Sequence, residues 1–538
     1  MKFSGVSLPG LRAVVCVAFL ALGAVSAHAA TYYVSTTGSD SAGDGSSAKA
    51  WKTIGFGLGK MAGGDTLIIK AGTYTDMANF VNGNNYRIPN GTAGAFTTIM
   101  AEQPGTVRIK NTGSLQYYDN PLNLTSSNSY VRVDGIVFEI ANSVYPEFIA
   151  SIEGNFNKIT RSFFRRGGQM EEYGGWVYVG GSNNLIEDSA GVGSGRYGFA
   201  MGGPGATTQR NILRRVVGRL DYSASDQPKA TFNVYGNDSG TNVRDILLQN
   251  CIAVDGRKGK NGAQPTYGGF YFPKNVVNVT VQGSIVLNVE AEYAGYFLKE
   301  MNSQNVKIVD SIAWGGYGTS SIAGIRANSG GNGFTVDHVT VGGYGVGYHN
   351  RESGTPRILS NSLFLNNGSA ADSDYGWTTV ANNAFNPSSQ ARGTSQVAVS
   401  ASPLKYIVRA EAGSELSSKG SDARDVGANV TKRYGRSGTL WGEAGYDQLT
   451  TENLWPWLLE DKIKAIFSEP NTPPAGAVPA TNDTTRGFAA ALDKFGKPMT
   501  LTRYVWQFLG NEIPADIYGT SATTLQAPTG LTATVVAN

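Results

Sequence analysis

The sequence is poor in the residues that hold metals and disulfides. Its 538 residues include two cysteines and three histidines. Cys16 and His28 lie in an N-terminal segment that has the pattern of a cleaved leader, so Cys251 would remain without a partner, and it is expected to be a small buried core residue. A disulfide framework, a cysteine-ligated metal and a histidine metal cluster are therefore excluded for the mature chain, in which His338 and His349 remain.

Charge is also scarce, and the two signs are nearly balanced. Charged residues make up 16% of the chain and the formal net charge is +3, so no basic excess marks a nucleic-acid binder. Beyond the N-terminal segment, no apolar run is long enough to suggest a membrane span. No glycine-rich phosphate loop is present either.

The first residues have the three parts of a secretory signal. Lys2 and Arg12 precede the apolar run Ala13–Val25, and an Ala-His-Ala sequence that ends at residue 29 offers a cleavage site. An uncleaved anchor is the alternative, but the apolar run is short for a membrane span. We predict a signal peptide at residues 1–29 and a secreted protein, in the extracellular space, in the periplasm or at the cell surface.

Glycine and tyrosine are abundant, with 70 and 26 residues, and short β-branched strands recur through the middle of the chain. Their spacing is roughly 27 residues, and about 33 where a loop is inserted, which is typical of a solenoid. One unit cannot bury its apolar face alone, but stacked units share a core. The pattern predicts an all-β right-handed parallel β-helix of about ten coils, each with about three strands. The same point of successive units is marked by Val131, Ile159, Ile186, Leu213, Ile246, Val279, Val306, Phe334 and Ile358.

Residues 31–74 carry three motifs in a row: YYVSTTGSD from Tyr32, WKTI from Trp51, and GDTLIIKAGTY from Gly64. They resemble the N-terminal cap of the pectate-lyase-like superfamily of secreted β-helix proteins. The resemblance implies the fold and a cap that covers the open end of the solenoid. It leaves the chemistry open, because the superfamily includes lyases, hydrolases, epimerases and proteins with no known activity. We expect residues 52–61 to form the amphipathic helix of the cap.

The composition changes after the repeats. Residues 423–428, ARDVGA, resemble the segment that follows the last coil in such proteins, and residues 458–467 and 501–509 have amphipathic helix patterns. We predict a β-helix with its cap at residues 30–430 and a C-terminal appendage with short helices at 431–519. Residues 520–538 resemble the first strand of a fibronectin type III module.

A repeated strand that begins with glycine predicts one column of outward side chains. When the repeats are aligned on Gly269, Gly295, Gly324 and Gly347, one position holds Tyr271, Phe297, Arg326 and His349, and another holds Lys299, Asn328 and Arg351. Aromatic rings could stack on sugars, and cations could hold uronate carboxylates. The alternative is a solvated sheet face that is stabilised by aromatic stacking. The predicted substrate-binding residues are Tyr271, Lys274, Arg326, His349 and Arg351.

Insertions between strands predict a second group of residues, because long loops on one side of a solenoid are often binding loops. Carboxylates of Asp221, Asp255 and Glu290 could form an oxygen-rich Ca²⁺ site. A nearby basic side chain could then abstract the proton next to a uronate carboxylate, and a cation would stabilise the resulting enolate. The alternative is mutually screened surface charge. The predicted catalytic residues are Arg257, Lys258, Lys260 and Lys299.

These observations predict a secreted lyase that cleaves an acidic, uronate-containing polysaccharide by β-elimination. Ca²⁺ is the expected cofactor and a monomer the expected state, with no nucleic acid and no membrane span involved. A glycoside hydrolase that uses Asp221 and Asp255 is the first alternative. A non-catalytic glycan-binding or structural cell-surface protein is the second. The polygalacturonase pattern of "NTD", "DD", "GHG" and "RIK" is absent, because "RIK" occurs at residues 108–110 without the other three. The "RxPxxR" sequence of common pectate lyases and the "DPH" sequence of alginate epimerases do not occur in the chain.

Overall fold

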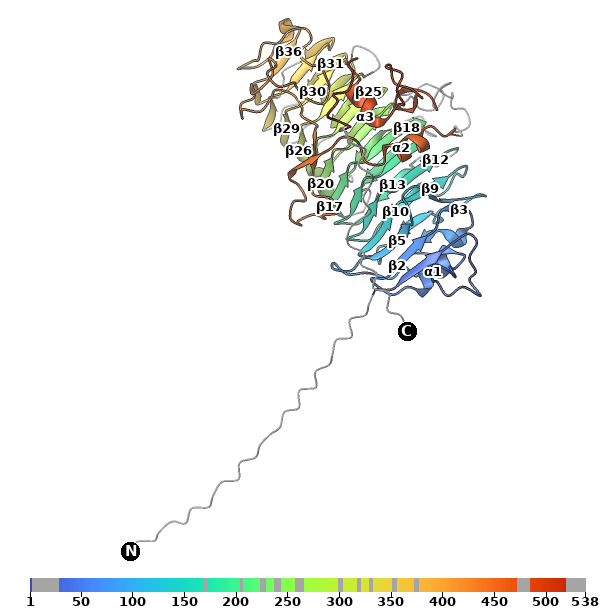
Figure 1. Ribbon diagram of the computed structural model, residues 1–538. Helices are drawn as coiled ribbons and strands as arrows, with labels where there is room; N and C mark the ends of the chain where they lie inside the picture. Colours follow the sequence, from blue (N-terminus) through green and yellow to red (C-terminus); the bar gives the residue numbers. More distant parts are fainter. Residues whose placement is uncertain are drawn as a thin grey trace.

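The chain folds as a right-handed parallel β-helix, which is seen from the side in Figure 1. The computed structural model describes residues 1, 29–168, 173–203, 207–222, 229–236, 243–256, 266–298, 303–316, 321–328, 332–350, 356–371, 377–471 and 484–518. The predicted signal peptide and the fibronectin-like tail lie outside these residues. Within them, three long sheets contain 13, 12 and 11 strands, somewhat more than the ten coils expected.

Every strand of these sheets pairs in parallel with the equivalent strand of the next coil, so each coil contributes one strand to each sheet. Sheet A contains β1 (Thr31–Val34), β2 (Thr66–Ile69), β5 (Thr97–Ala101), β8 (Val131–Asp134), β11 (Lys158–Thr160), β14 (Leu185–Glu187), β17 (Thr208–Arg214), β20 (Val243–Gln249), β23 (Val276–Gln282), β26 (Gln304–Val309), β29 (Asn332–Asp337), β32 (Arg357–Ser360) and β35 (Thr379–Ala381).

Sheet B follows sheet A in each coil. It contains β3 (Gly72–Tyr74), β6 (Val107–Lys110), β9 (Ile136–Ile140), β12 (Phe163–Arg166), β15 (Ala190–Ser194), β18 (Val217–Tyr222), β21 (Ile252–Val254), β24 (Ile285–Leu287), β27 (Ile312–Trp314), β30 (Thr340–Gly342), β33 (Leu363–Leu365) and β36 (Ala384–Asn386).

Sheet C completes the coil. It contains β4 (Val81–Asn82), β7 (Leu122–Leu124), β10 (Phe148–Ile152), β13 (Gly175–Val179), β16 (Tyr197–Met201), β19 (Ala230–Val234), β22 (Thr266–Phe272), β25 (Ala291–Leu298), β28 (Ala323–Ala327), β31 (Val346–Asn350) and β34 (Ser369–Ala371).

A single residue in the left-handed conformation turns the chain from sheet A into sheet B. Its φ lies between 46° and 76° in ten successive coils, at Gly135, Arg161, Asp188, Arg215, Asn250, Gly283, Asp310, His338, Asn361 and Asn382. Glycine, asparagine and aspartate adopt this conformation most readily, and they fill seven of these ten corners. This use of the corners explains why Gly and Asn punctuate the repeats.

The predicted register is correct over parts of sheet A and wrong at three steps. Ile159, Ile186 and Leu213 pair in one column, and Ile246, Val279, Val306 and Phe334 pair in another. However, Val133 rather than Val131 pairs with Ile159, and Leu248 rather than Ile246 pairs with Leu213. Both errors are two residues long and keep the same face inward, so the apolar pattern could not reveal them. The third error is that Arg357, not Ile358, pairs with Phe334.

Buried asparagines near the start of successive sheet A strands link each coil to the next by hydrogen bonds. We call this row the asparagine ladder. The backbone N–H of Asn157 donates to Asn184 Oδ1 at 2.8 Å, and that of Asn184 donates to Asn211 Oδ1 at 2.8 Å. Asn184 Nδ2 also donates to the carbonyl of Gly154 at 2.9 Å. Each amide thus pairs backbone groups that the corner would otherwise leave buried and unpaired.

Replacing Asn184 by alanine should therefore destabilise the protein by about 1–3 kcal/mol for each backbone group left unpaired. The measurement is the urea unfolding midpoint. Asn511→Ala is the matched control, because Asn511 Nδ2 donates to the carbonyl of Lys405 in an exposed hydrogen bond at 2.8 Å. Equal losses for the two variants would show that the ladder adds nothing beyond an ordinary surface hydrogen bond.

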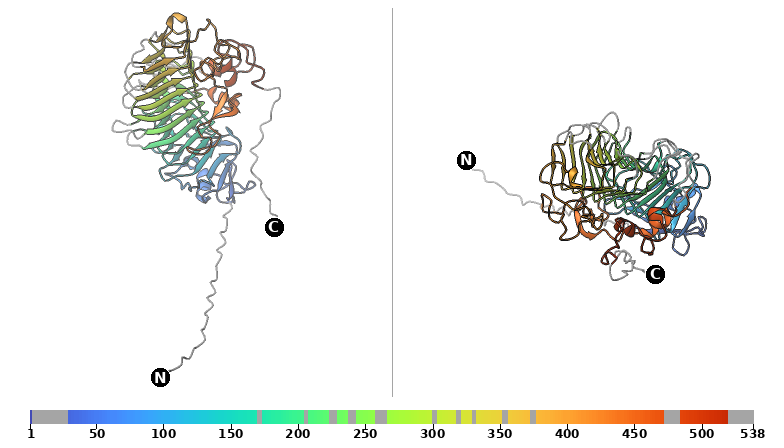
Figure 2. Two further views of the ribbon diagram at one scale, coloured as in Figure 1. Left: turned by 90° about the vertical axis from the view of Figure 1, so that its left-hand side faces the viewer. Right: turned by 90° about the horizontal axis from the view of Figure 1, so that it is seen from above.

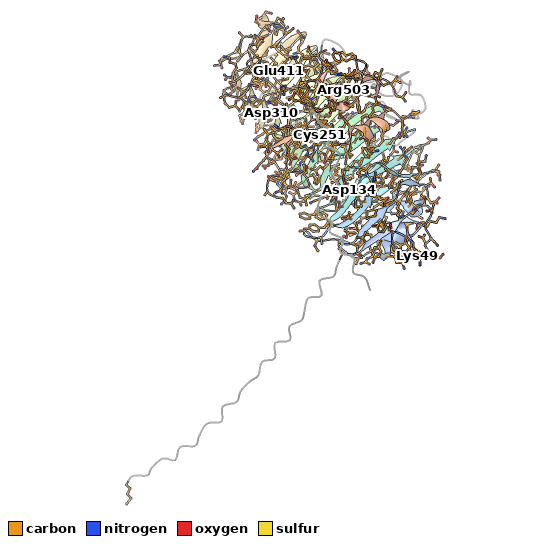
Figure 3. The ribbon with its side chains drawn as sticks, viewed as in Figure 1. Lys49, Asp134, Cys251, Asp310, Glu411 and Arg503 are labelled. Carbon is orange, nitrogen blue, oxygen red and sulfur yellow. The ribbon has the colours of Figure 1, made fainter. Side chains whose placement is uncertain are left out.

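Cys251 occupies a position that serine holds in several neighbouring coils, directly after the corner. Its backbone N–H donates to Ser284 Oγ at 3.0 Å, and the N–H of Ser284 donates to Ser311 Oγ at 3.2 Å. The thiol is fully buried inside the solenoid (Figure 3), and this burial raises its pKa to about 12. The prediction of a small buried core residue is confirmed.

The two ends of the described chain cover the solenoid. Helix α1 (Ile54–Lys60) closes the first coil where a cap helix was expected, and the Thr53 side chain accepts the Phe56 N–H at its N-terminus. After the solenoid, residues 398–471 and 484–518 run back along it, and we call them the return segment (Figure 2). It contains the antiparallel pair β37 (Lys432–Tyr434) and β38 (Leu449–Asn453), and helices α2 (Glu460–Phe467) and α3 (Leu501–Trp506).

The return segment covers the outer face of sheet B. Outward residues of this sheet, including Val217, Ile252 and Ile285, form one apolar cluster with Phe467 and Trp506 of the return segment. Sheet A receives polar contacts from the same segment: Arg214 Nη1 donates to the Arg436 carbonyl at 2.7 Å. Sheet C lies on the other side of the solenoid from α2 and α3 (Figure 2) and is left to form a groove.

No helix in the described part of the chain is both long and apolar enough to cross a membrane.

Candidate functional site

A groove of about 910 Å³ lies on the outer face of sheet C. Its floor is one column of outward side chains from strands β7 to β22, which pair in register across successive coils. Neighbouring strands are about 4.8 Å apart, so the five steps from β7 to β22 span about 24 Å. A groove of this length suits a chain-like ligand. The floor residues are Asn123, Ser151, Tyr178, Ala200, Asn233 and Tyr271.

Two walls rise where the chain enters and leaves sheet C. The entry wall lies before or at the start of each strand and consists chiefly of Tyr117, Tyr118, Tyr173, Arg196, Lys229 and Tyr267. The exit wall follows each strand and includes Ser126, Glu153, Tyr235 and Lys274. Because the coils stack in register, residues far apart in sequence become neighbours in these walls.

Three cations face the groove near β16, β19 and β22. Lys229 is only 6% exposed, and its ammonium lies 3.7 Å from the centre of the Tyr267 ring, a close cation–π contact. Its backbone N–H donates to the carbonyl of Arg196 at 2.8 Å, which fixes these two residues on adjacent coils. Arg196 lies over Tyr173, with 4.8 Å between the guanidinium and the ring centre, and Lys274 lies 5.8 Å from the ring centre of Tyr235.

Two tyrosines of the groove, Tyr178 and Tyr197, are held in their neutral form. Burial raises the pKa of Tyr197 above the usual 10.0, although the guanidinium of Arg196 acts in the opposite direction. Burial also raises the pKa of Tyr178, and the carboxylates of Glu153 and Glu147 act in the same direction. Both phenols therefore remain hydrogen-bond donors at neutral and mildly alkaline pH.

The structure confirms the predicted alignment of the repeats: the positions of Tyr271, Phe297, Arg326 and His349 pair in register on β22, β25, β28 and β31. Tyr271 lines the groove, and Lys274 lies in its exit wall. Arg326 and His349 continue the column beyond the groove and are 7% and 5% exposed. The Arg326 guanidinium donates to Asn328 Oδ1 at 2.6 Å and lies 5.0 Å from the Tyr293 ring centre.

Five predicted residues lie outside the described part of the chain. Arg257, Lys258 and Lys260 belong to the connection between β21 and β22, Lys299 follows β25, and Arg351 follows β31. Their assignments as catalytic residues and, for Arg351, as a substrate-binding residue stay predictions.

Asp221 and Asp255 do not face the groove, so the prediction that they lie beside the substrate is wrong. Asp221 lies near the end of β18 and Asp255 directly follows β21, both beneath the return segment, and they are 0% and 1% exposed. Asp221 binds the guanidinium groups of Arg219 and Arg486, each at 2.8 Å. Asp255 accepts hydrogen bonds from Asn288 Nδ2 at 2.5 Å and from the Tyr504 hydroxyl at 2.6 Å. Both carboxylates hold the return segment against the solenoid.

Glu290 lies one coil beyond Asp255, and its backbone N–H donates to the carbonyl of Gly256 at 3.0 Å. The structure does not gather it with the two aspartates: in the described ranges, no three acidic, histidine or cysteine side chains are grouped closely enough to hold a metal ion. The structure therefore gives no support to these three residues as a ligand set, and Ca²⁺ binding stays a prediction.

The sequence reasoning missed the entry wall, which carries Arg196 and Lys229. A signal was present, because Tyr117, Tyr145, Tyr173, Arg196 and Lys229 each precede a sheet C strand in successive coils. The glycine that marks the repeated strand begins at Gly269, so that alignment does not reach the earlier coils in which these positions lie.

Comparison with known proteins gives likeness at the level of structure only. No protein-family model and no curated protein matches the chain. Similar solved structures include pectate lyase Pel9A (16% identity, TM-score 0.44, covering 74% of this chain and 95% of that chain). They also include a rhamnogalacturonan lyase (16% identity, TM-score 0.38, covering 66% of this chain and 87% of that chain). A third is the PL6 family alginate lyase AlyGC (13% identity, TM-score 0.40, covering 64% of this chain and 52% of that chain). The assignment of the fold rests on the three parallel sheets: the chain is a right-handed parallel β-helix with one open, tyrosine-walled groove.

Proposed function

We propose that the protein is a polysaccharide lyase that cleaves a uronate-containing chain in the groove of sheet C. The observation that carries the proposal is the combination of three cations with a tyrosine wall over a floor about 24 Å long. Tyrosine rings can stack on sugar rings, and Arg196, Lys229 and Lys274 can pair with carboxylates. The resemblance of the N-terminal cap to secreted β-helix proteins agrees with this proposal.

Elimination at a uronate requires a group that neutralises its carboxylate, a base and an acid. The residues at the entry side of the groove offer one of each. Arg196 neutralises the carboxylate, so that the proton on C5 becomes more acidic. Lys229 acts as the base after its ammonium has lost a proton to solvent: the amine then takes the C5 proton, and the electron pair forms the C4–C5 double bond as the C4–O bond breaks. Tyr197, which pairs with Ala230 next to Lys229, donates its hydroxyl proton to the leaving oxygen. One proton is removed and one is returned, so the reaction needs no water and no redox partner.

Hydrolysis fits the groove less well. Glu147 and Glu153 are the two carboxylates among the described residues that line it, and they stand at opposite ends of β10. At about 3.3 Å per residue, their Cα atoms are about 20 Å apart. Paired carboxylates of glycosidases are about 5–10 Å apart. The pair Asp221 and Asp255, which the hydrolase alternative used, lies under the return segment.

The test is to incubate the purified protein with pectate, alginate and glycosaminoglycans, with Ca²⁺ and with a chelator, and to record ultraviolet absorbance and reducing ends together. We expect both signals to rise in parallel on at least one polymer, because every elimination creates one unsaturated uronate and one reducing end. New reducing ends without new absorbance would show hydrolysis. Binding without either product would show a non-catalytic glycan-binding protein.

A further inference from the structure

The charges of the groove are divided between its two halves. Among the described residues, the cationic side chains that line the groove, Arg196, Lys229 and Lys274, all lie in the half from β16 to β22. The half from β7 to β13 is lined, within the described residues, by amides, hydroxyls, tyrosines and the carboxylates of Glu147 and Glu153. An acidic sugar is thus attracted at one half and repelled at the other.

The carboxylate-bearing half also carries an exposed tyrosine cluster. Tyr117, Tyr118 and Tyr173 are 47%, 67% and 57% exposed, and all three line the groove. Tyr145, 37% exposed, lies beside them, with 5.9 Å between its ring centre and that of Tyr117. Large aromatic side chains are rarely left this open to water unless they meet a partner.

The carboxylates of Glu147 and Glu153 interact with residues of the groove beside this tyrosine cluster. Burial raises the pKa of Tyr117, and the nearby charge of Glu147 raises it further. Glu153 accepts a hydrogen bond from the Ser151 hydroxyl on the floor at 3.1 Å. Aromatic faces combined with hydroxyl-accepting carboxylates and amides suit uncharged sugar rings, which present apolar faces and hydroxyl donors.

We propose that the substrate is a heteropolysaccharide, in which the uronate lies at the cationic half of the groove and uncharged sugars lie over the half formed by β7 to β13. This inference rests on the proposed function and narrows its substrate class. A polymer made only of uronates would place carboxylates beside Glu147 and Glu153. Uncharged sugars avoid that repulsion and use the exposed rings.

The test compares two polymers by titration calorimetry at one salt concentration: hyaluronan, in which uronate alternates with an uncharged sugar, and polygalacturonate, which consists of uronates. We expect hyaluronan to bind more tightly to the full protein. Glu153→Gln should tighten polygalacturonate binding about fivefold, since it removes one like-charge contact of about 1 kcal/mol, and should not tighten hyaluronan binding. Tyr118→Ala should weaken hyaluronan binding about tenfold, the effect of losing one stacked ring.

Glu102→Gln is the matched control, because Glu102 is an exposed glutamate that follows β5 of sheet A, away from the groove. Tighter binding of polygalacturonate than of hyaluronan, no effect of Glu153→Gln, or no binding of either polymer would overturn the inference. Product formation separates the two proposals. If polygalacturonate yields unsaturated product and Glu153→Gln does not change its binding, the protein is a lyase but its substrate is not a heteropolysaccharide. If the binding pattern is as expected but no polymer yields product, the heteropolysaccharide preference stands and the lyase proposal fails.

Discussion

Replacing Lys229 by alanine should reduce kcat for elimination by about 10²–10⁴-fold, the range typical of a lost general base. KM should change little, because Arg196 and the tyrosine wall would still bind the substrate. The fall in kcat is expected because of where Lys229 lies. It is buried in the entry wall, on the coil next to Arg196, with its ammonium over Tyr267. The measurement is the initial rate of unsaturated product formation as a function of substrate concentration and pH.

Lys158→Ala is the matched control for this variant. Lys158 makes the same kind of contact on sheet A, with its ammonium 4.4 Å from the ring centre of Phe96. Both variants lose one cation–π contact, so their unfolding midpoints should shift alike, and only Lys229→Ala should lose activity. If Lys229→Ala keeps its kcat, the base is another residue. If KM also rises, Lys229 binds substrate instead.

The second large effect is expected on stability. Asp221→Ala should lower the free energy of unfolding by about 3–5 kcal/mol, because it leaves two buried guanidinium groups without their carboxylate. Arg219 donates to Asp221 and to the carbonyl of Phe467 in α2, the latter at 2.9 Å. Arg486 reaches Asp221 from the far end of the return segment. Urea unfolding, followed by tryptophan fluorescence, would report the loss, since Trp506 lies in the same apolar cluster as Phe467.

Two comparisons make this prediction specific. Glu512→Ala removes an exposed ion pair with Lys497, in which both side chains are about half exposed, and should cost no more than about 1 kcal/mol. A chelator should leave the unfolding midpoint of the unaltered protein where it is. If the chelator instead destabilises the protein as much as Asp221→Ala does, Asp221 holds a metal ion, as the sequence first suggested.

The contrast between Tyr271 and Asp221 shows where sequence reasoning succeeds in this fold. Tyr271 could be aligned with Phe297, Arg326 and His349 because parallel coils repeat one geometry, so a shared position in the repeat becomes a column in space. Asp221 resembled a groove residue because it stands near an insertion. Its partner Arg486 is 265 residues further along the chain, and no repeat relates the two.

The sequence by itself determined the solenoid, its cap helix and its outward columns, because these depend on alternation, on corner residues and on short-range repetition. Only the tertiary structure decided which sheet remains open. The return segment covers sheet B and buries Asp221 and Asp255 with it, while Arg196 and Lys229 come together with the tyrosines on sheet C. The physical reason is that a solenoid offers three similar faces. The choice among them depends on packing between segments that are far apart in sequence, which local patterns do not record.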